Sequence, residues 1–380
     1  MHTTIEHHTI QMPPDVPFCE NEDELLRFQQ ATLYDRRNTP DLRDHFVQCT
    51  KHLLANPFAS LLSGIDEGDG EKVLDIGLRY YTSCSVREVN IDRALYVWEM
   101  ITNDDHDFVV PKVSNSLLGR TYSCLCLAYF ELHEKAATGT PVKKDPTLER
   151  NRKPLPLPSN KRDFNLANDY LYVSSIYANG AAELGLVSPA VLSVGMHLRR
   201  VAQRDGIDLS KTQRYAPLRH LWRVVDARMR EWEEIQAKQA AKVAKAPNAY
   251  VCAAPGCGIQ GTQKKALLRC AGKCPPHRKP HYCGKECQKK DWKMHKHICK
   301  PDSELPSGGS SLGPPISDAP ALDADETDNI DIDAAFNEHY EGPGRAIEIN
   351  VPGGSKLRLQ SRNLTPAVMR WMKNQVEKGE

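Results

Sequence analysis

Residues 252–299 read CAAPGCGIQGTQKKALLRCAGKCPPHRKPHYCGKECQKKDWKMHKHIC and carry seven of the chain's twelve cysteines. Eight residues of this stretch form four closely spaced pairs of potential metal ligands: Cys252 and Cys257, Cys270 and Cys274, Cys283 and Cys287, His295 and Cys299. Eight Cys and His ligands fill two tetrahedral zinc shells. Because the shells contain no carboxylate and leave no open position, they are of the structural kind. The stretch therefore predicts two structural Zn²⁺ ions.

The spacing of the last two pairs indicates which ligands share an ion. Cys283 and Cys287 are four residues apart, as are His295 and Cys299, so each pair suits one face of a helical turn. No Gly or Pro occurs in residues 288–294, so a helix there would separate Cys287 from His295 by roughly 12 Å. Ligands of one zinc lie within about 4 Å of each other. We therefore expect a crossed arrangement, with Cys252, Cys257, Cys283 and Cys287 on one ion and Cys270, Cys274, His295 and Cys299 on the other.

Residues 281–299 resemble the second half of a MYND-type zinc finger. The shared pattern is Tyr-Cys-x3-Cys-Gln-x2-Asp-Trp-x2-His-Lys-x2-Cys, and the resemblance covers about fifty of the 380 residues. The first half departs from the family in two ways. Its first two Cys pairs have gaps of four and three residues where two are usual, and the stretch Pro275–Pro280 before His281 is longer than in the family. This departure leaves His277 and His281 as alternative ligands for the early positions.

The resemblance implies a function in protein recognition. MYND fingers bind short proline-containing peptides, and the residues that the family uses for this contact match Gln288 and Trp292. The two are four apart, so both suit one helical face, with Trp292 as an apolar platform and Gln288 as an amide for the peptide backbone. A second interpretation of Trp292 is packing over the zinc core. We expect an adaptor that acts in transcriptional or other regulatory complexes.

The charge of the finger, residues 252–299, suggests a rival function. Residues 251–300 contain twelve Lys and Arg and two acids, a formal +10, which becomes +7 with seven thiolates and two Zn²⁺. A basic zinc module can bind phosphate backbones. However, residues 301–344 contain eleven carboxylates and no Lys or Arg, and the whole chain carries +1. Nucleic acid is therefore the less favoured partner, and a nucleic-acid-binding regulatory protein is the alternative.

Catalysis is not expected. Some MYND fingers sit inside SET-type lysine methyltransferases, with most of the catalytic domain after the finger. Here 81 residues follow Cys299, and they contain no His-Cys-Pro-Asn-like run. A Gly-rich phosphate loop and a nucleophile elbow are also absent from the sequence.

The region before the finger, residues 21–246, has a helical pattern throughout and follows a flexible tail of residues 1–20. Gly77-Leu78-x-Tyr80 with Ala94-Leu95-x-x-Trp98 suggests a paired-helix repeat of the tetratricopeptide type, with an echo at residues 127–137. An irregular helical bundle explains the same pattern. Ser114 and Ser188 are suitable helix caps, and the last helix, from near Pro217, should extend as a solvated spacer to residue 246. These helices would offer a second interaction surface.

The region after the finger has two parts. Residues 301–344 are too acidic and too poor in apolar residues to fold, so we expect a disordered linker. Residues 345–380 alternate as a β-hairpin around Pro352-Gly353-Gly354-Ser355, and Thr365 then caps one helix. A hairpin and one helix rarely form a core alone, so this unit should dock on another part of the protein. The predicted fold class is mostly α, with a small two-zinc finger.

The composition and the N-terminal sequence limit the cellular compartments in which the protein is expected. Apolar residues make up 40% of the chain, charged residues 26%, and no run of eighteen apolar residues occurs. The first twenty residues lack a secretory pattern. We therefore expect a cytoplasmic or nuclear protein that does not span a membrane. The five cysteines outside the finger should be small buried apolar residues: Cys19, Cys49, Cys84, Cys124 and Cys126.

Overall fold

The computed structural model describes residues 4–6, 21–86, 88–104, 106, 108–141, 148, 166–276, 278–301, 344–351, 355–362 and 364–378. Its chain divides into a helical unit of residues 12–232 and a zinc-finger unit that combines residues 1–11 with residues 233–380. The boundary falls inside one long helix, α10 (Arg219–Lys245). Most of the expected N-terminal tail (1–20) and the part of the acidic linker from 302 to 343 lie outside the described residues.

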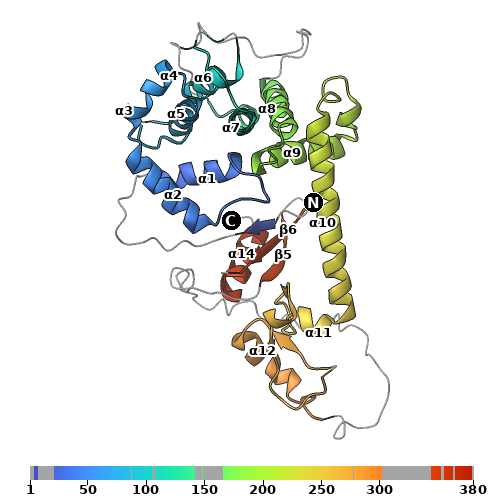
Figure 1. Ribbon diagram of the computed structural model, residues 1–380. Coiled ribbons are helices and arrows are strands. Elements are labelled where there is room, and N and C mark those ends of the chain that lie inside the picture. Colours follow the sequence, from blue (N-terminus) through green and yellow to red (C-terminus); the bar gives the residue numbers. More distant parts are fainter. Residues whose placement is uncertain are drawn as a thin grey trace. The chain divides into compact units, whose positions relative to one another are not determined.

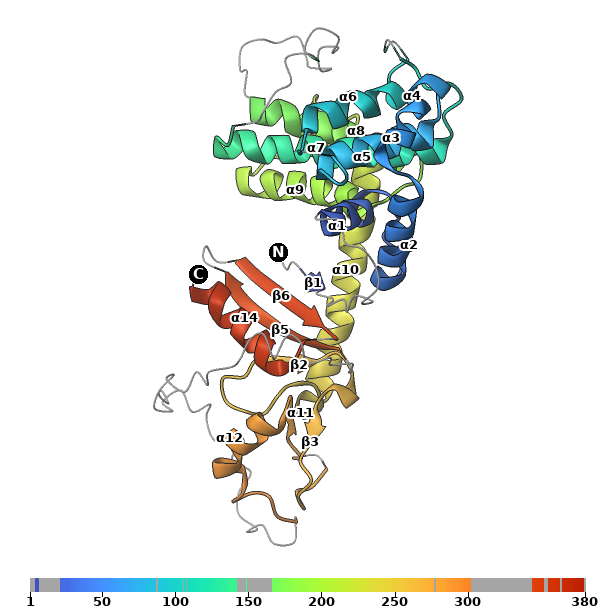
Figure 2. The same ribbon diagram turned by 90° about the vertical axis from the view of Figure 1, so that its left-hand side faces the viewer.

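The described part of the helical unit contains helices and the loops between them (Figures 1 and 2). Its α-helices before α10 are α1 (Glu22–Thr32), α2 (Leu42–Ala55), α3 (Phe58–Leu61), α4 (Ser63–Glu67), α5 (Gly70–Thr82), α6 (Ile91–Thr102), α7 (Asn115–Thr138), α8 (Leu166–Glu183) and α9 (Pro189–Asp205). A 3-10 turn, Leu209–Lys211, precedes α10. The predicted helical fold is confirmed.

The long helices begin at the expected caps. The Ser114 hydroxyl accepts a hydrogen bond from the Leu117 N–H at 3.1 Å, and Ser188 accepts one from Val191 at 3.2 Å. Each cap satisfies a backbone donor that has no partner within the helix. At the other ends, Gly139 follows α7 and Gly206 follows α9, and both adopt left-handed backbone with φ of 71° and 66°.

One predicted helix pair forms, and its echo does not. Gly77 on α5 faces Trp98 on α6 so closely that an added Cβ would lie 2.2 Å from the indole nitrogen. That indole N–H donates to the Leu74 carbonyl at 3.2 Å. The predicted echo at residues 127–137 is wrong, because all of these residues lie on the single continuous helix α7. The tetratricopeptide-type repeat is therefore not confirmed.

Helix α8 passes through Asn179 and Gly180, a pair that is typical of a helix end, and reaches Glu183. Gly180 gives room for a neighbouring helix, since an added Cβ would lie 2.9 Å from the ring of Tyr122 on α7. The Asn179 side chain accepts hydrogen bonds from the His220 and Leu221 N–H groups at 3.0 and 3.1 Å. Gly180 thus allows close packing of α8 against α7, and Asn179 caps the start of α10. A local sequence pattern does not distinguish these roles from a helix end.

Helices α7, α8, α9 and α10 share one hydrophobic core. Its buried members include Phe130, Leu171, Val191, Leu198 and Leu221. Four cysteines of this unit, Cys49, Cys84, Cys124 and Cys126, are buried as expected, while Cys19 lies outside the described residues. Burial raises the pKa of Cys124 and Cys126 to about 12, so these thiols are unreactive core residues.

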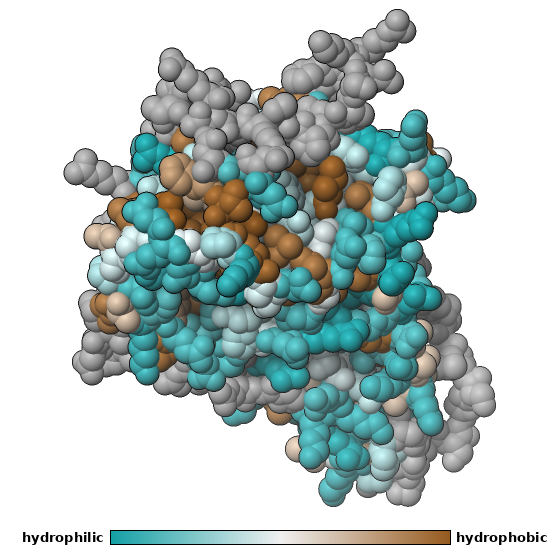
Figure 3. Space-filling model, turned by 45° about the horizontal axis from the view of Figure 1, so that its top comes forward, coloured by the Kyte–Doolittle hydropathy of each residue, from teal (hydrophilic) through white to brown (hydrophobic). Residues whose placement is uncertain are grey.

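Apolar side chains also reach the surface of the helical unit. Figure 3 shows them as a brown band bordered by hydrophilic residues. Phe108 and Val109, in the loop between α6 and α7, are among the exposed large apolar residues of the unit, at 53% and 45%.

The described part of the zinc-finger unit combines two small sheets with several helical segments. Its elements are β1 (Thr4–Glu6), the second half of α10, α11 (Pro247–Tyr250), β2 (Ile259–Gly261), a 3-10 turn (Lys264–Ala266), β3 (Leu268–Arg269), β4 (His281–Tyr282), α12 (Lys285–His295), β5 (Arg345–Val351), β6 (Ser355–Ser361) and α14 (Pro366–Lys378). Strands β3 and β4 form an antiparallel pair.

The C-terminal hairpin docks on the finger, whereas the sequence predicted docking without identifying the partner. Strands β5 and β6 pair antiparallel, and the turn at residues 352–354 lies outside the described residues. Strand β2 of the finger pairs antiparallel with β5, placing Ile259 opposite Ile347. Together with β1, which runs parallel to β6, these strands form a four-stranded sheet in the order β1-β6-β5-β2.

The second half of α10 contacts this sheet. It continues as a helix to Lys245, as expected of the spacer, but the Gln236 side chain accepts a hydrogen bond from Arg358 on β6 at 3.0 Å. The Gln239 amide donates to the Gly261 carbonyl on β2 at 3.2 Å. The expectation of a fully solvated spacer is therefore corrected. An apolar-stripe search misses this face, because its contacts are amide hydrogen bonds.

Finger and hairpin share one core, which explains how so small a finger is stabilised. Helix α14 begins at its predicted cap, where Thr365 Oγ1 accepts from the Val368 N–H at 3.3 Å. The buried members of the core outside the metal ligands include Ile259, Leu267, Tyr282, Ile347, Ile349, Leu359, Val368 and Met369. Five of these eight residues lie after residue 344, so the finger's core is incomplete without them.

Candidate metal centre

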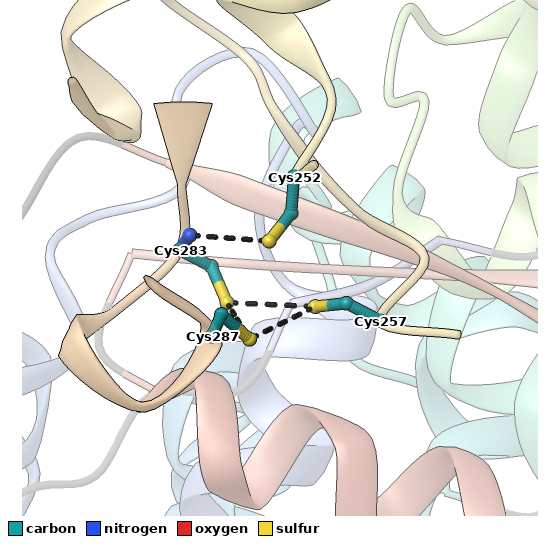
Figure 4. A group of neighbouring side chains, drawn as sticks. All are labelled: Cys252, Cys257, Cys283 and Cys287. Carbon is teal, nitrogen blue, oxygen red and sulfur yellow. Dashed lines mark hydrogen bonds between the residues drawn. The ribbon is translucent and has the colours of Figure 1, made fainter. Parts of the chain in front are cut away.

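Four thiols converge at one point of the zinc-finger unit (Figure 4). The Sγ atoms of Cys257, Cys283 and Cys287 lie 3.4 to 3.6 Å apart. Cys252 completes the group, and all four sulfurs lie within 4.8 Å of one another. Tetrahedral zinc with Zn–S bonds near 2.3 Å separates its sulfurs by roughly 3.8 Å. We call this group the four-thiolate site.

A second group contains three thiols and one imidazole. His295 Nε2 lies 3.4 Å from the Sγ atoms of both Cys270 and Cys274. Cys299 Sγ lies 3.4 Å from Cys274 and 3.9 Å from Cys270. We call this group the His295 site. Both groups fit a zinc ion, and the crossed assignment of ligands predicted from the sequence is confirmed.

The ligands occupy the two ends of α12 rather than its interior. Cys283 lies before the helix, next to its N-cap Gly284, and Cys287 is in the first turn. His295 is the last helical residue, and Cys299 follows the turn at residues 296–298. The four-residue spacing was predicted to place each pair on a helical turn, and here it spans a helix boundary instead. The helix still assigns its two ends to two different ions.

Alternative early ligands are not found in the described clusters. His281 lies on β4, and its Nδ1 is 3.1 Å from the Lys279 carbonyl. It belongs to neither group of ligands. His277 lies outside the described residues. The enlarged gaps of the first two Cys pairs are thus accommodated with all eight predicted ligands in place.

Backbone N–H groups and a glycine support the sulfurs. Cys283 N–H donates to Cys252 Sγ, and Gly272 N–H donates to Cys270 Sγ, each at 3.4 Å. Such bonds to a thiolate orient it and lower its negative charge. Gly272 also has no room for a side chain, because an added Cβ would lie 2.2 Å from Cys299 Sγ.

An arginine from the C-terminal helix also reaches the four-thiolate site. Arg370 on α14 places Nη1 at 3.4, 3.5 and 3.9 Å from the sulfurs of Cys283, Cys287 and Cys257. Its Nη2 donates to Glu286 at 3.1 Å. In Figure 4, α14 is the faint red helix that runs beneath these cysteines. The sequence does not predict this contact, because a lone arginine on a helix gives no spacing signal.

The two acids of the finger are both engaged. Glu286 pairs with Arg370, and Asp291 accepts a hydrogen bond from the hydroxyl of buried Tyr282 at 2.7 Å. The Tyr282 bond joins β4 to α12 and so fixes the helix relative to the strand pair. The same bond gives a structural role to Tyr282 and Asp291, which are the Tyr and Asp of the Tyr-Cys-x3-Cys-Gln-x2-Asp-Trp pattern.

The two predicted peptide-binding residues lie on α12. Trp292 is 46% exposed, and its ring meets that of His295 at a centroid distance of 6.0 Å and an angle of 60°. Gln288 is half-buried one turn earlier. Trp292 thus contacts the zinc ligand His295 with part of its ring, and much of the side chain is exposed to solvent. Packing over the zinc core therefore buries only part of the indole.

Two interleaved four-ligand sites on a short strand pair and one helix define a two-zinc finger, which is a structural metal module. Residues 252–299 match the MYND finger family over the whole span from Cys252 to Cys299. This stretch of the chain is a MYND zinc finger with two zinc sites.

Among curated proteins, the chain is 34% identical over 112 residues to Tudor domain-containing protein 1 of Oryzias latipes. The match covers 28% of this chain and 9% of that protein, so the chain spans a small fraction of its relative. No solved structure matches the chain. None of the described helices combines the length and the apolar character that a membrane crossing requires.

Proposed function

We propose that this chain is a non-catalytic adaptor whose MYND finger binds proline-containing peptides through Gln288 and Trp292. MYND fingers mediate protein interactions, and the observation that carries the peptide proposal is the exposure of Trp292 on a helix held rigid from both ends. A large aromatic residue that is half open to solvent at such a place is a typical anchor for an extended apolar peptide.

The geometry of α12 supports a combined aromatic and amide contact. Gln288 and Trp292 are one turn apart, so their side chains leave the helix on the same side. The indole offers an apolar face to a proline ring, and the amide offers a donor and an acceptor to the peptide backbone. Ile298, which is 60% exposed beyond the helix, adds apolar surface in the same part of the finger.

The proposed adaptor acts in the cytoplasm or nucleus, as part of regulatory complexes. Zinc sites with seven thiolates persist where thiols stay reduced, which is the condition of those compartments. The proposal assigns no reaction to the chain, since both sites fill their shells with protein ligands and suit a structural role.

A titration of labelled proline-containing peptides tests the proposal on the full chain. Trp292→Ala should weaken binding by about 1–3 kcal/mol if the indole is a hot spot, and Gln288→Ala should weaken it less. Met294→Ala is the matched control, because Met294 is 66% exposed on the same helix but two residues further along, on the opposite side. Zinc content, measured on each variant, must stay at the wild-type value.

Equal peptide affinities for wild type and Trp292→Ala would reject the proposed site. Binding of DNA or RNA by the full chain that responds to Lys substitutions on the finger but not to Trp292→Ala would favour the nucleic-acid alternative. The two results separate because an aromatic platform for proline contributes little to the salt-dependent binding of phosphates.

A further inference from the structure

The two zinc sites differ in charge and in their surroundings. Four thiolates around Zn²⁺ carry a net −2, whereas three thiolates and a neutral imidazole carry −1. Among the described residues, the His295 site accepts a hydrogen bond from within the finger, where the Gly272 N–H donates to Cys270 Sγ. The four-thiolate site has an additional, cationic donor in Arg370, which belongs to the C-terminal helix.

Arg370 is held at the sulfurs by packing on one side and an ion pair on the other. The preceding residues on α14, Val368 and Met369, are 1% and 0% exposed in the core shared with the finger. The guanidinium is planar and presents several N–H groups in a fixed fork. One amino group is shared among the thiols, while the other donates to Glu286. An ammonium group has no such fork and cannot satisfy both sides in this way.

We propose that Arg370 is a positioning residue for the four-thiolate zinc site, so that the C-terminal hairpin and helix are part of the metal centre. The guanidinium offsets one of the two excess negative charges of the buried cluster and donates hydrogen bonds to three of its sulfurs. Both effects stabilise the thiolate form that zinc needs, and both are confined to this site. Zinc at the four-thiolate site is therefore retained only while α14 is docked.

Zinc release from the full chain into a coloured chelator tests the inference. Arg370→Gln should release one of the two ions about 10–100-fold faster than wild type, with the other ion unchanged. Arg370→Lys keeps the charge but not the planar fork of N–H groups, so its rate of zinc release should lie between those of wild type and Arg370→Gln. Lys378→Gln removes the same charge from an exposed position on the same helix and should release both ions at the wild-type rates.

Cobalt substitution identifies which site is affected. Cobalt bound by four thiolates has a stronger sulfur-to-metal charge-transfer band than cobalt bound by three, so loss of the stronger band from Arg370→Gln would support the proposal. Glu286→Gln, which frees one side of the guanidinium, should give a smaller change at the same site. Two release rates equal to wild type in Arg370→Gln would overturn the inference. Equal acceleration at both sites would also overturn it, since this indicates general loosening of the unit.

Discussion

The hydroxyl of Tyr282 and the carboxylate of Asp291 share a 2.7 Å hydrogen bond that connects β4 to α12. Asp291 and Glu286 are the only acids among residues 251–300, and Glu286 is paired with Arg370. The twelve Lys and Arg of the same stretch therefore have few acidic neighbours within the finger. Among the described residues of the finger, positive charge therefore predominates around Trp292.

This charge predicts a preference among peptide ligands. Lys289 on α12 and Lys296, its C-cap residue, lie three residues before and four residues after Trp292, and both are exposed. Proline-containing peptides with flanking Asp or Glu should bind more tightly than neutral ones. The double variant Lys289→Gln/Lys296→Gln should lose a few-fold in affinity for the acidic peptide, at about 0.2–1 kcal/mol per exposed pair. Peptide titrations at low and high salt measure this electrostatic contribution to the affinity, because salt screens the charges and should reduce the difference between wild type and the double variant.

The control for the lysine variant is Lys264→Gln/Lys265→Gln, which removes two exposed charges from the 3-10 turn of the finger. It should leave the salt dependence close to that of wild type. If both double variants lose affinity equally, the charge effect is a property of the whole finger and not of the surface beside Trp292.

Gly272 predicts a selective loss of one zinc ion. Its missing side chain leaves space for Cys299 Sγ, and an added Cβ would also lie 3.4 Å from Cys270 Sγ. Gly272→Ala should therefore displace two ligands of the His295 site, and elemental analysis of the full chain should find about one zinc where wild type has two. Gly284→Ala is the matched control, since an added Cβ there meets nothing within 4 Å. Two zinc ions in Gly272→Ala would show that the loop relaxes without losing its ligands.

The sequence predicted the ligands of the finger because zinc chemistry is local. A tetrahedral shell restricts both the type of side chain and the spacing within each pair, and a helix between Cys287 and His295 then forces the pairs apart. The helical caps at Ser114, Ser188 and Thr365 were predictable for the same reason, since each bonds to a backbone N–H three residues along.

The contacts that join distant segments were not predictable in this way. Arg370 lies 87 residues after Cys283, and nothing in its own neighbourhood distinguishes it from a surface arginine on an amphipathic helix. The pairing of β2 with β5 likewise depends on a three-residue strand that is too short to be recognised alone. Only the need of an isolated hairpin for a core indicated that it must dock, and this need does not identify the partner.

The acidic residues between 301 and 344 predict an electrostatic screen for the finger. Eleven carboxylates directly follow a stretch with a formal +10, so the two segments stay close along the chain. Deleting residues 305–340 should raise retention on heparin, most clearly at low salt. A variant that replaces the segment with a neutral Gly/Ser linker of equal length controls for the change in chain length. Identical elution of wild type and both variants would count against screening.

His197 predicts a pH-dependent stability of the helical unit. Its pKa is lowered to about 4, chiefly by burial and further by His133, Arg200 and Arg204. The ring also packs edge-on against Phe130, with centroids 5.1 Å apart and an interplanar angle of 76°. Between pH 6.5 and about 4, the unfolded chain binds a proton at His197 that the folded chain does not. The free energy of unfolding therefore falls as the pH drops through this window and is unaffected by this residue above it.

His197→Gln removes that titration while keeping a polar side chain. Urea unfolding of the full chain, followed by tryptophan fluorescence at pH 7 and pH 5, measures the loss of stability on acidification. The variant should lose less between these two pH values than wild type, even if the lost ring contacts lower its stability at pH 7. Acid-driven zinc loss from the finger affects both proteins alike and cancels in the comparison. Equal acid sensitivity of the two proteins would mean that His197 is protonated in the folded state at pH 5, and that its burial has no effect on stability in this range.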